Sequence, residues 1–209
     1  MNDSVQLKIY FTGVGGQGTL LASRVLGEAA MTAGYAVLVS ETHGMAQRGG
    51  VVTSTVIIGA LASPIISPGE ADIVVSFEAL EAFRALSRCH SQTVVITNTA
   101  AIIPYSVAIG QAHYPAVERL MELIAPQVGQ LLTLGAETLA QQAGSSLAVN
   151  MVLLGALAQT GRLPFPGKII AGVIATRTPP KHVDTNLRAF QLGQEAIARQ
   201  VPPRKLKTA

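Results

Sequence analysis

The chain has 209 residues and is 49% hydrophobic, which is enough to bury a full core as one α/β domain. No apolar run approaches the roughly 18 residues that span a bilayer. The single cysteine, Cys89, excludes an internal disulfide and an iron–sulfur cluster held by this chain alone. The pI of about 9.2 arises from four basic residues in the last eleven positions, and the remainder carries a net charge of −1. We therefore predict one domain over residues 1–200, a solvated basic tail over 201–209, and no nucleic-acid or membrane partner.

Charged residues make up 13% of the chain, against about 25% in typical soluble domains. A surface this poor in charge is typical of a chain that is partly covered by another subunit, so we expect an oligomer. The first residues, MNDSVQLK, lack the apolar region of a signal peptide, and we expect a cytoplasmic protein.

Residues 8–18, KIYFTGVGGQG, predict a buried strand, a tight turn and the start of a helix near Gly15. Glycine permits positive φ and close approach by a ligand, and a helix N-terminus offers free N–H groups and a positive dipole end. The turn is therefore a candidate site for a phosphate, diphosphate or carboxylate. Its candidate binding residues are Gly13, Gly15, Gly16, Gln17 and Gly18. The alternative is that these glycines serve only close helix–strand packing.

Residues 19–33 carry apolar side chains at helical spacing, and Gly34 is placed to end that helix. Residues 36–40 predict a short buried strand, with Glu41 just beyond its end. In a dinucleotide-binding unit, an acidic residue at this position can hold a ribose hydroxyl. The order of strand, glycine turn, helix, strand and acid is therefore that of a nucleotide-binding unit.

The stretch from Glu41 to Gly50, ETHGMAQRGG, places polar side chains of different chemistry between two apolar strands. We interpret Glu41, His43, Gln47 and Arg48 as members of a binding or docking loop. Arg48 can bind a carboxylate or phosphate, and His43 can donate or accept a proton near neutral pH. A mobile surface loop is the alternative. No metal site is expected, because His43 has no second ligand at a suitable spacing.

The middle of the chain alternates between strand and helix patterns. Residues 51–59 are β-branched and follow the preceding strand too closely for a helical crossover, so this strand is expected to be antiparallel or at an edge. Strands are then predicted over 71–77, 93–97 and 128–134, with helices over 78–88, 116–125 and 136–143. This alternation predicts a doubly wound, mostly parallel sheet. Asn98 is interpreted as a simple turn residue.

The last third of the chain is helical in pattern. Residues 146–160 are almost entirely apolar, with Asn150 as the polar break, so this helix is expected to be buried on every side. A short helix is predicted within 164–174 and a polar helix over 181–200. The predicted fold class is α/β, with a Rossmann-like, mostly parallel sheet and a helical C-terminal section.

Five segments together carry a resemblance to a known family: GVGGQG after a strand, SETHGMAQRGG, GEADIVVSFEALEA, NMVLLGAL and VDTNLRAFQLG. They resemble segments of the gamma-type component of 2-oxoacid:ferredoxin oxidoreductases, most closely the type found in indolepyruvate enzymes, and the resemblance extends over about residues 10–193. GVGGQG alone is a weak signal, but its combination with HGMAQRGG at this spacing is specific.

The resemblance implies a subunit that docks on a catalytic (alpha) subunit and is inactive alone. Enzymes of this family decarboxylate a 2-oxoacid on thiamine diphosphate with Mg, pass electrons through iron–sulfur clusters to ferredoxin, and release an acyl-CoA. The resemblance implies that the partner holds these cofactors and that this chain lies near the active site and the CoA route. Gly13–Gly18 and His43–Gly50 match the family's signature loops and are assigned to binding or docking. No catalytic residue and no metal ligand is carried over.

Resemblance favours indolepyruvate and other aryl-pyruvates as substrates, with pyruvate, 2-oxoglutarate or a branched-chain 2-oxoacid as alternatives. A different class of function is a stand-alone NAD(P)-dependent dehydrogenase, which the glycine turn and Glu41 would allow. Against it, the sequence has no Tyr-x-x-x-Lys pair and no positioned catalytic histidine with a carboxylate partner. A purely structural binding module would show no turnover alone, yet its loss would inactivate the complex.

Overall fold

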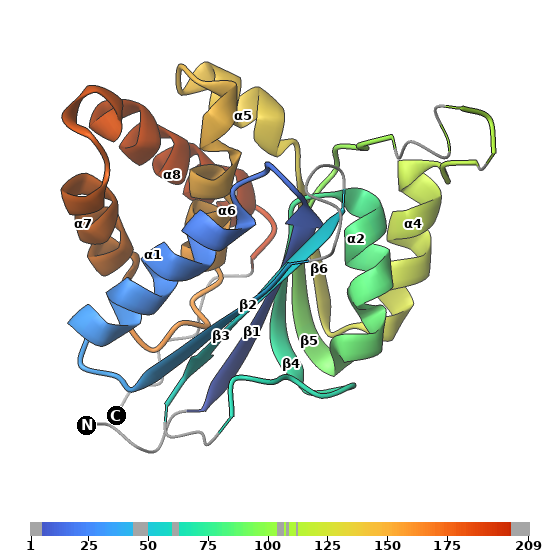
Figure 1. Ribbon diagram of the computed structural model, residues 1–209, viewed down its shortest axis with the longest axis horizontal. Coiled ribbons are helices and arrows are strands. Elements are labelled where there is room, and N and C mark those ends of the chain that lie inside the picture. The colour runs from blue at the N-terminus through green and yellow to red at the C-terminus, as the bar shows by residue number, and fades with distance from the viewer. Residues whose placement is uncertain are drawn as a thin grey trace.

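A computed structural model describes residues 6–43, 50–59, 63–103, 107, 109–111 and 113–201. Six strands form one sheet in the order β2-β3-β1-β4-β5-β6 (Figure 1). The strands are β1 Leu7–Val14, β2 Val37–His43, β3 Val51–Ile58, β4 Ala71–Ser76, β5 Cys89–Asn98 and β6 Gln130–Leu134. Strands β1, β4, β5 and β6 pair in parallel, whereas β3 is antiparallel to both of its neighbours. The predicted, mostly parallel sheet is therefore confirmed.

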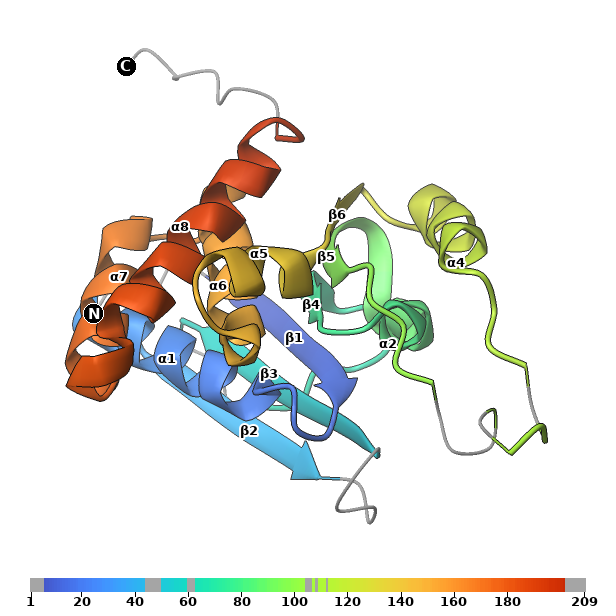
Figure 2. The ribbon, with the colours of Figure 1, turned by 90° about the horizontal axis from the view of Figure 1, so that it is seen from above.

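Helices cover both faces of this sheet (Figures 1 and 2). They are α1 Thr19–Thr32, α2 Ala79–Arg84, α4 Val117–Ile124, α5 Ala136–Gln142, α6 Val149–Gln159, α7 Gly167–Arg177 and α8 Val183–Ala198. Alternate strand residues enter two cores, because successive side chains of a strand point to opposite faces. Ile73 and Val75 join the core under α1 and α6, and Val74 joins the core that also contains Ile124 of α4.

Strand β3 separates β1 from β2, and this is the main departure from a simple nucleotide-binding unit. The antiparallel direction predicted for β3 is confirmed, but the edge position belongs to β2. Two strand spacings, roughly 10 Å, therefore lie between β1 and β2 instead of one. The end of β2 is displaced from the glycine turn that comes after β1.

Three sequence-based boundaries were wrong in detail. Helix α1 begins at Thr19, after Gly18 as its N-cap, and not near Gly15. Glu41 lies inside β2, opposite Ser54 of β3, and not beyond the end of the strand. The predicted helix over 78–88 is a short α-helix followed by a 3₁₀ turn. Pairing with β3 extends β2 past the apolar residues that the sequence pattern detects.

The long apolar helix is confirmed as a central element. Every residue of α6 from Val149 to Leu157 is buried. Helix α8 crosses α6 at two glycines, Gly155 of α6 and Gly193 of α8. A Cβ added at Gly155 would lie 1.9 Å from the Phe190 carbonyl oxygen, and a Cβ added at Gly193 would lie 1.9 Å from the Val152 carbonyl oxygen. Because both residues are glycines, the backbones of α6 and α8 can contact each other, and this contact sets the distance between the two helices. In the described residues, no helix is long and apolar enough to cross a membrane.

Candidate functional site

The glycine turn, residues 14–18, connects β1 to α1 and is stabilised by the side chain of Gln17. The Val14 N–H donates to Gln17 Oε1 at 2.7 Å, and Gln17 Nε2 donates to the Phe77 carbonyl at 2.8 Å. A Cβ at Gly13 would lie 2.8 Å from both Gln17 Oε1 and Phe77 Cβ. Gly13 therefore serves close packing, and Gln17 braces the turn against the end of β4.

The remaining glycines shape the open side of the turn. Gly16 has φ +99° and Gly18 has φ +84°, backbone conformations that L side chains rarely adopt. No described atom lies within 4 Å of a Cβ built at Gly16, whereas one at Gly18 would lie 2.7 Å from Asn150 Nδ2. The Gly15 N–H donates to the Gly50 carbonyl at 2.9 Å. The turn thus faces open space at Gly16 and is closed by helix α6 at Gly18.

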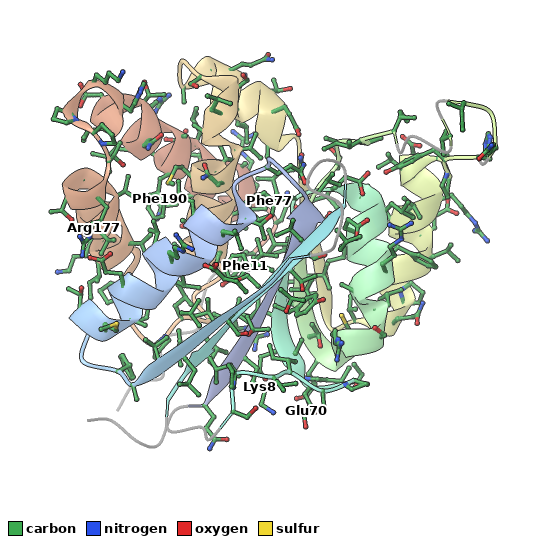
Figure 3. All side chains as sticks on the ribbon, in the orientation of Figure 1. Lys8, Phe11, Glu70, Phe77, Arg177 and Phe190 are labelled. Carbon is green, nitrogen blue, oxygen red and sulfur yellow. The ribbon has the colours of Figure 1, made fainter. Side chains whose placement is uncertain are left out.

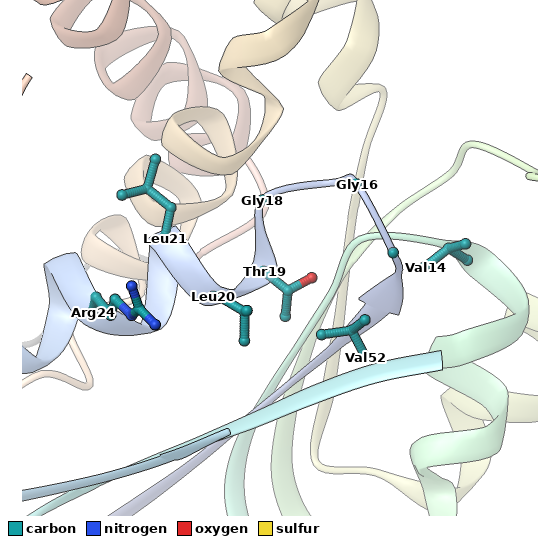
Figure 4. Close-up of a pocket in the computed structure, with 9 residues that line it drawn as sticks. Val14, Gly16, Gly18, Thr19, Leu20, Leu21, Arg24 and Val52 are labelled. Carbon is teal, nitrogen blue, oxygen red and sulfur yellow. The ribbon is translucent and has the colours of Figure 1, made fainter. Parts of the chain in front are cut away.

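A cavity of about 480 Å³ opens beside this turn (Figure 4). It is lined by Val14, Gly15, Gly16, Gly18, Thr19, Leu20, Leu21, Arg24 and Val52. Helix α1 points its N-terminus into the turn and has no acidic residue in its first turn. Free N–H groups and the positive end of the helix dipole favour an anion here. The buried Thr19 hydroxyl has no hydrogen-bond partner in the described part of the chain.

Arg24 brings a positive charge to the rim of this cavity. Its Nε and one terminal nitrogen donate to the two oxygens of Glu41 at 2.7 and 3.0 Å, and the arginine side chain is two-thirds exposed. The Glu41 carboxylate raises the pKa of Arg24, chiefly through its hydrogen bond. The sequence interpretation missed Arg24, although it is the only lysine or arginine between Lys8 and Arg48.

The two predicted loops are only partly brought together. His43 is the last residue of β2 and pairs with Val52, whose side chain lines the cavity. The side chain of His43, and Gln47 and Arg48 entirely, lie outside the described residues, so their binding roles stay predictions. Glu41 is bound by Arg24 and is separated from β1 by β3, which disfavours the arrangement that a dinucleotide ribose requires.

The ends of β4 and β5 hold polar groups that serve the fold. Asn98 is fully buried and makes four hydrogen bonds: Nδ2 donates to the Phe77 carbonyl at 3.0 Å and Glu137 Oε1 at 2.8 Å, and Oδ1 accepts from the N–H groups of Ala136 at 3.0 Å and Ala100 at 3.4 Å. The interpretation of Asn98 as a simple turn residue is therefore wrong. This side chain ties together the ends of two strands and the start of α5.

Glu78, also buried, acts in the same way at the start of α2. One carboxylate oxygen accepts from the Glu81 N–H at 3.0 Å and caps the helix, and the other accepts from the Ile102 N–H at 3.1 Å and from the Tyr114 hydroxyl. Burial, together with the hydrogen bond to Glu78, raises the pKa of Tyr114. Glu78 thus anchors the segment that leads into α4.

No described group of three His, Cys, Asp or Glu side chains is placed to hold a metal ion. Cys89 is half-buried, and burial raises the pKa of its thiol to about 11. A thiol with this pKa remains protonated at neutral pH and is a poor nucleophile and a poor metal ligand.

The fold is that of an α/β protein with a mixed six-stranded sheet flanked by helices, and its first glycine turn opens onto a cavity at the start of α1. Residues 8–196 match the model of the pyruvate ferredoxin/flavodoxin oxidoreductase family, and the chain belongs to this family. The resemblance to the gamma-type component is thus confirmed.

Curated relatives match almost end to end. The chain is 41% identical over 190 residues to indolepyruvate oxidoreductase subunit IorB of Methanothermobacter thermautotrophicus, covering 91% of this chain and 97% of the relative. IorB of Thermococcus kodakarensis is 40% identical over 91% of this chain and 96% of its own length. The 2-oxoglutarate synthase subunit KorC of M. thermautotrophicus is 26% identical over 92% and 96%.

Solved structures share the fold. The gamma subunit of a keto/oxoacid ferredoxin oxidoreductase from Geobacter sulfurreducens superposes with a TM-score of 0.67 at 23% identity, covering 93% of this chain and 99% of that one. A 2-oxoglutarate:ferredoxin oxidoreductase from Magnetococcus marinus, solved with 2-oxoglutarate, coenzyme A and succinyl-CoA bound, gives 0.73 at 19% identity, covering 95% of this chain and 32% of that one.

Proposed function

We propose that this chain is the small subunit of an indolepyruvate:ferredoxin oxidoreductase and docks on a separate catalytic subunit. The observation that carries the proposal is the 41% identity to an IorB subunit over nearly the whole length of both chains. Identity to the KorC subunit of the same organism is 26%, which favours an aryl-pyruvate over 2-oxoglutarate as the substrate of the complex. Electrons from the oxidative decarboxylation would leave the complex on ferredoxin.

The described part of this chain lacks the ligands that the cofactors of this reaction require, which supports their binding to the catalytic subunit. A four-thiolate cluster needs four cysteines and this sequence has one, whose thiol is held protonated by burial. The described carboxylates and histidines do not group as a Mg site for thiamine diphosphate. We therefore assign thiamine diphosphate, Mg and the iron–sulfur clusters to the catalytic subunit, and no chemical step to this chain.

The glycine-turn cavity is the part of this chain best suited to a small-molecule role. CoA carries a diphosphate, and the first turn of α1 offers free N–H groups with Arg24 at the rim. We assign the diphosphate of CoA to Gly15, Gly16, Gly18 and the first turn of α1, with Gly13 and Gln17 supporting the turn. His43, Gln47 and Arg48 are retained as proposed binding or docking residues, and Glu41 as the residue that orients Arg24.

The first test is co-purification. A tagged chain expressed in its native host is expected to bring down a brown, thiamine-dependent partner. The eluate should reduce a viologen dye with indolepyruvate and CoA faster than with pyruvate, 2-oxoglutarate or branched-chain 2-oxoacids. A colourless chain that is recovered alone and binds NAD would contradict the proposal.

A matched pair of glycine variants tests the cavity. Gly16→Val should raise the KM for CoA about tenfold while the complex still assembles, because a β-branched residue disfavours φ +99° and distorts the anion site. Gly34→Val is the control: Gly34 has φ +84° and similarly open surroundings, but it lies beyond the other end of α1. Equal effects of the two variants would mean that strain, not the anion site, causes the loss.

A further inference from the structure

A second cavity, of about 360 Å³, is lined by residues of the first half of α1, the start of α6 and the segment from α7 into α8. Its apolar walls come from Leu21, Val25, Leu147, Ala148, Met151 and Pro179. No acidic residue lines it, and Arg177, whose position is labelled in Figure 3, stands at its α7 side with Nε bound to Glu28 at 2.6 Å. Polar side chains also line it, namely those of Ser145, Asn150, Thr178, His182, Thr185 and Asn186. The cavity thus suits a group that has apolar faces and hydrogen-bond acceptors and no positive charge.

One buried polar side chain in this cavity has an unused donor. Asn150 is 4% exposed, and its Oδ1 accepts from the Met151 N–H at 3.0 Å. That bond fixes the amide orientation, because a flipped amide would set two N–H groups against each other. Asn150 Nδ2 makes no hydrogen bond to any described residue. It is not among the fully buried polar atoms without a partner, which in the described residues are Thr19 Oγ1 and Glu81 Oε2, so it is accessible from the cavity. A ligand acceptor in the cavity would satisfy this donor.

The second cavity adjoins the glycine-turn cavity. Leu21 lines both, and Asn150 Nδ2 would lie 2.7 Å from a Cβ at Gly18, the residue that caps α1. Leu21 is 49% exposed, so a ligand whose phosphate rests on the first turn of α1 would reach Asn150 by passing over this side chain. The two adjoining cavities thus offer a helix N-terminus on one side and apolar walls on the other, with Asn150 Nδ2 between them.

We propose that this second cavity, the Asn150 subsite, binds one of the two neutral, planar groups that CoA carries a few bonds away from its diphosphate. Asn150 Nδ2 donates to an acceptor on that group, and the aliphatic walls pack against its faces. CoA offers this chemistry twice, in the ring nitrogens of adenine and in the first amide of the pantetheine arm. The proposal rests on the proposed function, since it extends the CoA site by a subsite for a group beyond the diphosphate.

The test uses the co-purified complex and isothermal titration with three probes: CoA, ADP and 4′-phosphopantetheine. Asn150→Asp keeps the Oδ1 acceptor for Met151 but replaces the donor with a negative oxygen, so its Kd for CoA should rise tenfold or more. Asn150→Ala should raise this Kd about fivefold, as expected for the loss of one hydrogen bond. Only one of the two fragments should lose affinity in these variants, and that fragment identifies the occupant as adenine or pantetheine.

The apolar wall provides an independent variant with little risk of misfolding. Leu147 is 85% exposed and lines the cavity, so Leu147→Ala should weaken CoA binding about threefold without changing the thermal unfolding midpoint. Ile65 is 71% exposed and does not line this cavity, and Ile65→Ala is the matched control.

The proposal is overturned if Asn150→Asp and Leu147→Ala bind CoA with the wild-type Kd. If Gly16→Val weakens CoA binding in that case, the anion site stands and only the Asn150 subsite is lost. If Gly16→Val also binds CoA normally, the CoA assignment of the proposed function fails together with the subsite.

Discussion

Asn98 and Asn150 are both buried asparagines, but their amides are used differently. Asn98 satisfies its amide with four hydrogen bonds to β4, to the start of α5 and to the segment after β5. Asn150 makes one, to the backbone of its own helix, and turns its nitrogen toward a cavity and the glycine turn. The first arrangement holds strand ends together, and the second leaves a donor for a ligand.

The contrast extends to the surroundings of each residue. Around Asn98, the neighbouring buried Glu78 is also satisfied, by two backbone N–H groups and the Tyr114 hydroxyl. Around Asn150, two adjoining cavities meet at Leu21. A buried polar side chain is thus structural where its partners are protein groups, and it indicates a binding site where its remaining donor faces open space.

The largest expected effect on stability comes from disturbing the contact between α6, which carries Asn150, and α8. Gly155→Ala places a Cβ where the Phe190 carbonyl lies 1.9 Å away, so α6 and α8 must separate. We expect a loss of about 3 kcal/mol in the free energy of unfolding and poor soluble yield, as for severe overpacking. Gly172→Ala in α7 is the control, because no described atom lies within 4 Å of its added Cβ, and it should stabilise the protein by about 0.5 kcal/mol. A soluble Gly155→Ala protein with an unchanged unfolding midpoint would disprove the tight crossing.

The comparison itself is tested by truncating both asparagines. Asn98→Ala leaves a backbone carbonyl, two N–H groups and the Glu137 carboxylate without this partner, and should cost about 3 kcal/mol of stability. Asn150→Ala breaks one hydrogen bond and should cost about 1 kcal/mol or less. Thermal unfolding of the two variants measures the difference. Equal losses would mean that Asn150 is as structural as Asn98.

The smallest effect concerns Cys89, at the opposite end of β5 from Asn98. Burial raises the pKa of its thiol to about 11, so its thiolate fraction at pH 8 is roughly 100-fold below that of a free cysteine. Alkylation by iodoacetamide should be correspondingly slow at pH 8 and should accelerate as the pH rises toward 11. A rate equal to that of free cysteine at pH 8 would show that this end of β5 opens readily.

The fold class could be predicted from local pattern. Apolar runs ended by glycine, helical spacing in residues 19–33, and strand–helix alternation from 71 to 143 depend on neighbouring residues only, and these elements are present. The position of β3 could not be predicted in full. Its short connection excluded a parallel neighbour of β2, but only the competition for pairing with β1 placed it inside the sheet.

The sequence by itself determined the family, the glycine turn and the all-apolar helix, because each depends on contiguous residues. Tertiary structure decided the roles within the site. Gln17 reaches the Phe77 carbonyl and becomes a brace, and Arg24 reaches Glu41 across α1 and β2. Asn150 meets Gly18 only when α6 packs beside α1. The hydrogen-bond partners of a polar side chain are often far away in the sequence, and only folding brings them within reach.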